Sequence, residues 1–393
     1  MVPKKQSPLS VGILVHNPPF QGGIVQYCIL LANELKKYVA VSAVGFKKLY
    51  PPFFYKGKLP KENKSGIQFE TPLASFITWY NPLSWVKAYF SLSKNDLIHI
   101  QWVSPLLAPL QYVILTLNKF FAKKPVIATC HNIEPHESTF LDKILTKLVF
   151  KQINHFIVHA FQNKKRLHTH YHIPLSHIHV VPHGTFEFFK QWSDHKSQKD
   201  LKEEFHLENK KVILFFGYIR EYKGLLYLLR ALPEVLKKNK EVILLVAGEL
   251  WQPLEIYEQE LSKLGIRESV VLFPFYISDR EVHRYFEVAD LVVLPYFNTE
   301  QTISGPLLVS LAFGKPLIIS LVGGIGEIIK EGINGLLVEG GNNSQLSQKI
   351  DFLLNNPALQ KKLSQEALKT NEHYKWENVA KDIYQVYQKA LED

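Results

Sequence analysis

Short apolar runs and amphipathic stretches alternate along this chain, and the whole alternation occurs twice. In the first half, the strand-like runs span 11–15, 39–46, 97–103, 125–130, 155–160 and 178–184. In the second half they span 211–217, 241–248, 269–275, 290–296, 316–324 and 334–341. Helical spacing fills the intervals. Because parallel strands need such crossover connections, we predict two doubly wound α/β sheets.

A polar, charged stretch at 192–211 separates the two halves. Each half of this kind binds ligands at the carboxyl ends of its strands, so two facing halves predict a central cleft. The predicted division is an N-terminal Rossmann-like domain over 1–190, a linker over 191–210, a C-terminal Rossmann-like domain over 211–368, and a C-terminal helix over 369–393. We expect that last helix to pack back on the N-terminal domain.

Composition excludes several classes of protein. The chain of 393 residues has only two cysteines, Cys28 and Cys130, which excludes a disulfide framework and favours a cytoplasmic, reducing location. The most hydrophobic longer stretch, 102–121, is interrupted by proline and fits a buried or interfacial helix better than a membrane span. A formal charge of +10 favours anionic partners. Basic residues are dispersed, so we predict no nucleic-acid partner.

The strongest candidate binding segment is 215–232, with the sequence FFGYIREYKGLLYLLRAL. A strand ends at Gly217, and Arg220 and Lys223 follow just before Gly224 opens a helix. Two cations beside a helix N-terminus form a site for an anion such as phosphate. A solvated turn with ordinary surface charges would explain the same residues.

A second helix start lies in the same half of the chain. Ser304 and Gly305 precede Pro306, and proline fits the first turn of a helix. The free backbone N–H groups of that turn, near Leu307, would point at whatever lies before the helix. Two such devices in one domain suit a diphosphate, although a routine strand–loop–helix junction would have the same sequence.

Two segments of the first half also follow strands. Gly22 and Gly23 open the first helix, and glycine lets a backbone approach a ligand closely. His131 comes directly after the run 125–130, where we expect it to face the cleft. A hydrogen-bonded loop histidine is the alternative for His131, and the same two interpretations apply to His183.

Taken in order, these segments resemble family 4 of the retaining glycosyltransferases over nearly the whole chain. The resemblance rests on the Gly-Gly loop, HN-x-x-PHE, VPHG, FGYIREYKG, ADLVVLPY, SGPLLVSLAFGKP and VGG-x-x-E-II-x-x-G-x-NGLLV. It implies the GT-B fold, in which two Rossmann-like α/β domains face a central cleft. It also implies a nucleotide-sugar donor held mainly by the second domain, and a glycan, lipid-linked or other hydroxyl acceptor held mainly by the first.

The resemblance implies a role for each candidate residue. Arg220 and Lys223 would hold the donor diphosphate, and His131 would lie beside the transferred sugar. The remaining donor contacts would come from Gly22, Gly23, Gln301, Ser304, Gly305, Pro306 and Leu307. No cofactor and no metal are expected, because the cations and the helix start stabilise the leaving diphosphate and the chain has no Asp-x-Asp motif.

The sequence departs from the family pattern at one place. The family often carries two glutamates separated by seven residues before its Gly-x-Pro motif, and this chain has Gln301 and Val309 there. Valine cannot bind a ribose hydroxyl. The missing carboxylates favour one alternative to a retaining transferase, a non-catalytic protein that binds nucleotide-sugar or glycan. A sugar-nucleotide epimerase on the same fold is a second alternative.

Two weaker patterns complete the sequence. Five histidines between 168 and 179 form a His-rich segment that we interpret as a surface loop rather than a metal site. Lys143, Lys147 and Lys151 fall on one helical face, followed by the basic run 164–166. They either solvate a helix over a core or contact anionic lipid on the inner face of a membrane.

Overall fold

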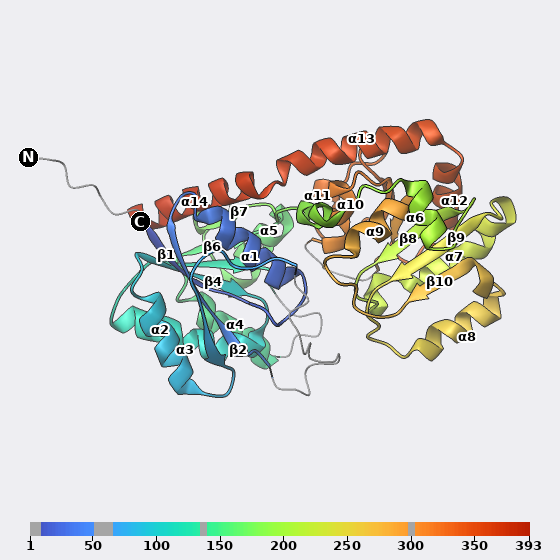
Figure 1. Cartoon of the computed structure of the whole chain (residues 1–393). Helices are drawn as coiled ribbons and strands as arrows, with labels where there is room; N and C mark the ends of the chain where they lie inside the picture. Colours follow the sequence, from blue (N-terminus) through green and yellow to red (C-terminus); the bar gives the residue numbers. More distant parts are fainter. Residues whose placement is uncertain (1–8, 51–65, 134–139, 298–302) are drawn as a thin grey trace, which may run out of the picture. The chain divides into compact units, whose positions relative to one another are not determined.

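The structure is a computed structural model, and it describes residues 9–50, 66–133, 140–297 and 303–393. The chain forms two compact units (Figure 1). Unit 1 comprises Met1–Gly184 together with Trp376–Asp393, and unit 2 comprises Thr185–Lys375. The boundary therefore lies at Gly184/Thr185, whereas the sequence placed it after residue 190.

Unit 1 is built on a parallel sheet with the strand order β3-β2-β1-β4-β5-β6-β7 among the described residues. The strands are β1 (Ser10–Leu14), β2 (Ala40–Lys48), β3 (Leu73–Thr78), β4 (Leu97–Trp102), β5 (Val126–Cys130), β6 (His155–Val158) and β7 (Ile178–Val180). The helices are α1 (Gly23–Leu35), α2 (Pro82–Leu92), α3 (Ala108–Phe120), α4 (Phe140–Phe150), α5 (Phe161–Tyr171) and α14 (Trp376–Glu392).

Apolar side chains of this sheet face two separate cores, as expected for parallel strands buried on both sides. Leu14 and Ile98 pack against α2, α3, α4 and α5. Ile13 and Leu97, which point the opposite way, pack against α1 and α14. Helix α14 thus belongs to unit 1, and its Tyr387 hydroxyl lies 2.7 Å from Nδ1 of His99 in β4.

Unit 2 is built on a second parallel sheet, with the order β10-β9-β8-β11-β12-β13 in the part of the chain that the structure describes. The strands are β8 (Lys211–Phe216), β9 (Val242–Ala247), β10 (Val270–Phe273), β11 (Leu291–Leu294), β12 (Leu317–Ser320) and β13 (Leu336–Val338). The helices are α6 (Gln198–Glu204), α7 (Leu225–Lys238), α8 (Leu254–Leu264), α9 (Val282–Val288), α10 (Gly305–Ala312), α11 (Ile325–Ile328), α12 (Asn343–Leu354) and α13 (Pro357–His373).

The segment 191–210, expected as a linker, is an ordered part of unit 2. It contains α6, whose N-terminal Ser197 and Asp200 form a reciprocal capping box. Leu201 and Leu207 are buried in the core of unit 2 beneath this helix. The hydrophilic composition of segment 191–210 reflects the solvent-exposed face of α6. Apolar side chains spaced along the segment pack into the core of unit 2.

Two other expectations need correction. The His-rich segment is not a loop, because His168 and His170 lie in α5 and His179 lies in β7. Neither β3 nor α2 was expected from the sequence. No helix in the described ranges is long and apolar enough to cross a bilayer, and the stretch 102–121 is divided among the end of β4, a 3₁₀ turn and α3.

Strand order fixes where each sheet can hold a ligand. In unit 1 the order reverses at β1, which pairs with β2 on one side and β4 on the other. In unit 2 it reverses at β8, which pairs with β9 and β11. Ligands of open α/β sheets bind outside the carboxyl ends of the strands at such switch points.

Candidate active site

The segment after β8 is shaped by two glycines. Gly224 has φ +75° and ends the 3₁₀ turn Glu221–Lys223. A Cβ at Gly224 would lie 1.9 Å from the carbonyl oxygen of Pro295, just after β11, so only glycine fits against it. Gly217 has φ +109°, and a Cβ there would lie 3.0 Å from Cγ of Pro306. The Arg220–Lys223 loop therefore starts beside the first turn of α10.

Lys223 is the more buried of the two candidate cations, with 6% of its surface exposed. Its Nζ lies 4.0 Å from the centroid of the Tyr296 ring and 5.3 Å from that of Tyr222. Burial, and to a lesser extent the charge of Arg220, lower the pKa of Lys223 to about 7. An arriving anion would favour the charged form of this amine.

Arg220 lies on an aromatic face. Its Cζ is 3.6 Å from the centroid of the Trp251 ring. Within the described ranges Arg220 forms no ion pair with a carboxylate and its buried Nε has no hydrogen-bond partner, while another part of its side chain is hydrogen-bonded to Tyr222. The guanidinium therefore keeps in-plane N–H donors available near Lys223, whose amine feels its charge.

Helix α10 begins at the other side of the same loop. Ser304 is its N-cap: Oγ accepts a hydrogen bond from the backbone N–H of Leu307 at 3.4 Å. The same Oγ lies 2.6 Å from the hydroxyl of Tyr296, the residue whose ring contacts Lys223. Gly305 and Pro306 form the first helical turn, which contains no acidic side chain. Arg220, Lys223, Ser304, Gly305, Pro306 and Leu307 are thus brought together at the carboxyl ends of β8 and β11.

The structure does not place either of the two positions where the family often has glutamate, Gln301 and Val309, beside the cationic loop. Gln301 lies outside the described residues. Val309 is 3% exposed and packs in the core of unit 2 rather than beside the cationic loop. A valine at position 309 is therefore compatible with the fold of α10.

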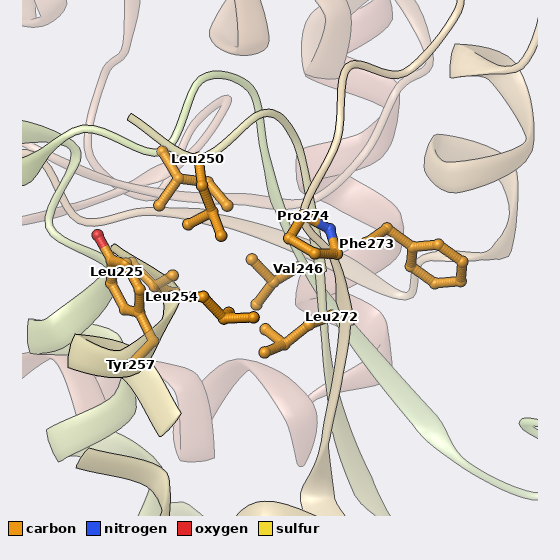
Figure 2. A pocket seen from close by; sticks show the side chains of 9 residues that line it. Leu225, Val246, Leu250, Leu254, Tyr257, Leu272, Phe273 and Pro274 are labelled. Atoms are coloured by element: carbon orange, nitrogen blue, oxygen red, sulfur yellow. The ribbon is translucent and has the colours of Figure 1, made fainter. Parts of the chain in front are cut away.

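A cavity in unit 2 lies close to the cationic loop and is apolar. Its lining includes Leu225, Val246, Leu250, Leu254 and Tyr257, and Figure 2 shows their side chains gathered around it. Ile219, the residue before Arg220, also lines it. Such a space suits hydrocarbon rather than phosphate, so the charged groups next to it define a separate site.

The remaining predicted residues lie in unit 1. Gly22, with φ +108°, is the N-cap of α1, and no side chain caps that helix. His131 follows β5, and its Nε2 donates to Oε1 of Gln101 at 2.9 Å. Burial is the main cause that lowers the pKa of His131 well below its usual value, and the nearby His159 and His183 lower it further. His131 is therefore a neutral hydrogen-bonding group at neutral pH.

Sequence reasoning named His131 and His183 but missed His159 and Tyr27, which complete a cluster with them. The ring centroid of Tyr27 lies 4.7 Å from that of His131, 5.4 Å from that of His159 and 4.9 Å from that of His183. Burial lowers the pKa of His159 to about 4 and that of His183 to about 3. The signal was present, since His131 and His159 directly follow β5 and β6, and His183 lies three residues after the end of β7. A neutral, polar lining of this kind suits hydroxyl groups rather than anions.

Comparison with known proteins assigns the family. The model described as "Glycosyltransferase Family 4" matches residues 21–185, and the model described as "Glycosyl transferases group 1" matches residues 196–370. The chain belongs to the group 1, family 4 glycosyltransferases.

Individual relatives agree with this assignment. An uncharacterized glycosyltransferase of Methanocaldococcus jannaschii is 32% identical over 187 residues, 47% of this chain and 46% of that protein. A D-inositol 3-phosphate glycosyltransferase of Corynebacterium kroppenstedtii is 24% identical over 277 residues, 68% of this chain and 60% of that protein. The chain spans about half the length of the first curated relatives that it matches.

Solved structures show the fold. Anabaena HepE in complex with UDP has a TM-score of 0.78 at 16% identity, covering 96% of this chain and all of HepE. A glycosyltransferase from Rickettsia africae has a TM-score of 0.78 at 18% identity, covering 98% of this chain and 99% of that one. This glycosyltransferase therefore has the GT-B fold.

Proposed function

We propose that this glycosyltransferase transfers a sugar from a nucleoside-diphosphate sugar to a hydroxyl acceptor with retention of anomeric configuration. The observation that carries the proposal is the group formed by Arg220, Lys223 and the first turn of α10 in unit 2. Departure of a nucleoside diphosphate develops negative charge, and preplaced cations and helix N–H groups stabilise it. The structural neighbour HepE was determined in complex with UDP, which supports a donor of this class.

We propose further that the transfer needs no divalent metal and no protein nucleophile. The cationic loop does what a metal does elsewhere, and the leaving phosphate can accept the acceptor's proton on the same face of the sugar. His131 and the neutral histidines around Tyr27 in unit 1 would bind sugar or acceptor hydroxyls. The acceptor is then a glycan, a lipid-linked saccharide or another hydroxyl compound.

One experiment separates this proposal from a non-catalytic binder and from an epimerase. The protein is incubated with a panel of UDP-, GDP-, ADP- and TDP-sugars, with candidate acceptors, and products are identified by NMR. A transferase releases nucleoside diphosphate and gives an α-product from an α-donor; an epimerase returns an altered donor; a binder gives no turnover. An inverted product would refute retention alone.

The same assay tests the site. Each of Arg220→Ala and Lys223→Ala is expected to lower kcat/KM by about 30- to 1000-fold, on the order of 2–4 kcal/mol of transition-state stabilisation. Lys361→Ala with Lys362→Ala, two exposed lysines of α13 in the same unit, is the matched control. If the double variant of Arg220 and Lys223 keeps the wild-type kcat/KM, these residues do not hold the donor.

We also propose that unit 1 docks reversibly on the anionic inner face of a membrane, where a lipid-linked acceptor would lie. Helices α2, α3 and α4 are neighbours on one side of the unit 1 sheet (Figure 1). The α2–α4 face consists of exposed apolar side chains: Leu83, Phe90, Leu106, Tyr112, Phe120, Phe121, Phe140, Leu141, Ile144 and Leu148. A concentration of large apolar side chains on a surface is typical of an interaction site.

The charges of this face favour anionic lipid. Helices α2 and α3 contain no acidic residue, and α4 contains only Asp142. Exposed lysines accompany the apolar side chains: Lys87, Lys119, Lys143, Lys147 and Lys151. The alternative, in which the α4 lysines solvate a helix whose apolar residues form a core, is disfavoured because Leu141, Ile144 and Leu148 are exposed.

Liposome flotation tests the docking. Binding is expected to rise with the fraction of anionic lipid and to fall with salt, since each lysine near an anionic surface contributes about 1 kcal/mol. Changing Lys143, Lys147 and Lys151 to Glu should remove most of the bound protein. The control is the same charge change at exposed positions of α13: Lys361, Lys362 and Lys369. Equal flotation of all three proteins, or equal binding to neutral vesicles, would refute the docking and leave the transferase assignment intact.

A further inference from the structure

We propose that Trp251 is a positioning residue of the donor site: it holds the Arg220 guanidinium by its face, so that the N–H edge stays available for the diphosphate. The inference rests on the proposed function, because it assumes that Arg220 meets a nucleotide phosphate. It concerns a residue outside every family motif quoted above, in the sequence AGELW after β9.

Backbone pairing brings the two side chains together. The ladder between β8 and β9 continues beyond both strands as an isolated bridge between Ile219 and Leu250. Ile219 N–H donates to the carbonyl of Glu249 at 2.9 Å, and Trp251 N–H donates to the carbonyl of Ile219 at 3.0 Å. Because neighbouring side chains of an extended segment point to opposite faces, Ile219 and Leu250 line the apolar cavity while Arg220 and Trp251 share the other side.

The contact between Arg220 and Trp251 is a close face-on stack. Arg220 Cζ lies 3.6 Å from the Trp251 ring centroid and 5.8 Å from that of Tyr218. The rings of Tyr218 and Trp251 are in turn 5.8 Å apart in an edge-to-face arrangement. A half-buried tryptophan that is itself braced by a second ring gives the guanidinium one preferred orientation.

Arg220 differs in this respect from other arginines of unit 2. Three of them form carboxylate pairs: Arg230 with Glu260 at 2.6 Å, Arg267 with Glu258 at 3.1 Å and Arg284 with Glu204 at 2.6 Å. A carboxylate occupies the N–H edge that binds phosphate, whereas an aromatic face leaves that edge open. Within the described residues, Arg220 has the aromatic partner and no such carboxylate pair. Its polar neighbours are Tyr222, to which its side chain is hydrogen-bonded, and the more distant charge of Glu249, so part of the N–H edge stays open.

Stacking also reduces the conformational entropy that the Arg220 side chain loses when a ligand binds. A free arginine side chain loses rotamer freedom when it engages a ligand, and a side chain already held in place loses less. Lys223 is held in a similar way over the ring of Tyr296, whose hydroxyl contacts the N-cap of α10. Arg220 and Lys223 therefore each contact the face of an aromatic ring, and removal of one ring should weaken the affinity for an anion.

Nucleotide titration provides the test. The probes are UDP, GDP, ADP and TDP, measured by calorimetry, and the tightest is used throughout. Trp251→Leu is expected to weaken binding about 3- to 30-fold, the range of a partly desolvated cation–π contact. Trp251→Phe keeps a ring face and should stay within about 3-fold of wild type. Melting temperatures confirm that each variant is folded.

A double-mutant cycle separates positioning from packing. If Trp251 acts through Arg220, Trp251→Leu should weaken binding little or not at all in an Arg220→Ala background. An equal penalty in both backgrounds, or wild-type affinity of Trp251→Leu, would overturn the inference while nucleotide binding, and with it the proposed function, stands. If none of the four nucleotides binds the wild-type protein up to millimolar concentration, both the proposed function and this inference fail.

Discussion

Binding of a nucleoside diphosphate to this protein is expected to take up a proton above neutral pH. The perturbation is pH itself, and the responding group is Lys223. Burial is the main reason why the pKa of its amine falls to about 7, and the charge of Arg220 adds to the effect. A diphosphate close to Nζ would stabilise the ammonium form and raise that pKa again.

The size of the effect follows from that pKa. At pH 8 an amine with a pKa of about 7 is roughly one-tenth protonated, so binding would bring in about 0.9 of a proton. Between about pH 8 and pH 10, the affinity should then fall about tenfold per pH unit, or about 1.4 kcal/mol. Below about pH 6.5 Lys223 is already charged and its contribution should level off.

Calorimetry in buffers of different ionisation enthalpy measures the proton uptake directly. The nucleotide that binds most tightly is titrated at pH 7, 8 and 9 into wild-type protein and into Lys223→Met, which keeps the length of the side chain without its charge. Any protonation of the nucleotide phosphates is common to both proteins and cancels in the comparison. Equal proton uptake by wild type and Lys223→Met at pH 8 would refute the reasoning.

Three further results are expected. Stability should also depend on pH through Lys223, because its pKa in the folded protein lies below the unfolded value of 10.5. Between about pH 7 and 10.5 the unfolded chain binds more protons, so the free energy of unfolding rises with pH. Denaturant melts should find a smaller slope for Lys223→Met. Leu201→Ala should lower the free energy of unfolding by about 2–5 kcal/mol, because Leu201 is the fully buried side chain of α6, and an unchanged melting temperature would contradict its place in the core. Transfer should continue in excess EDTA, and a loss that Mg²⁺ or Mn²⁺ restores would rule out metal independence.

Residue patterns were sufficient for the central strands of both sheets. Strands β9 and β11 are buried on both faces, and their continuous apolar sequences indicate this directly. Strand β4 is equally buried, although His99 and Gln101 lie between its apolar residues. Strand β3 has mostly exposed or half-buried residues and a sequence, LASFIT, without an apolar run, so only its pairing with β2 makes it a strand. Helix α2 did carry a signal, since Asn81 caps it and Pro82 begins it.

The candidate site was predictable in its parts but not in its arrangement. Arg220, Lys223 and Ser304 could be selected because each follows a strand or begins a helix. Nothing in the order of residues indicates that Trp251 stacks on Arg220 or that Tyr296 joins Lys223 to the cap of α10. Those contacts depend on the strand order β9-β8-β11, which brings segments distant in sequence to one edge.

Unit 1 is built from two separate segments of the chain, and this has a consequence for how the chain folds during synthesis. Val379, Ile383 and Tyr387 of α14 are fully buried among residues of α1 and of the unit 1 sheet, although they are synthesised after the whole of unit 2. Unit 2 is one continuous segment and can complete its core as soon as Lys375 has emerged. Most of unit 1 is made before unit 2, but Val11, Tyr27 and Ile127 stay uncovered until α14 has been synthesised. Domains usually fold in the order of their synthesis, and here the order of completion is reversed, so the first-made unit is the one exposed to aggregation and chaperones for longest.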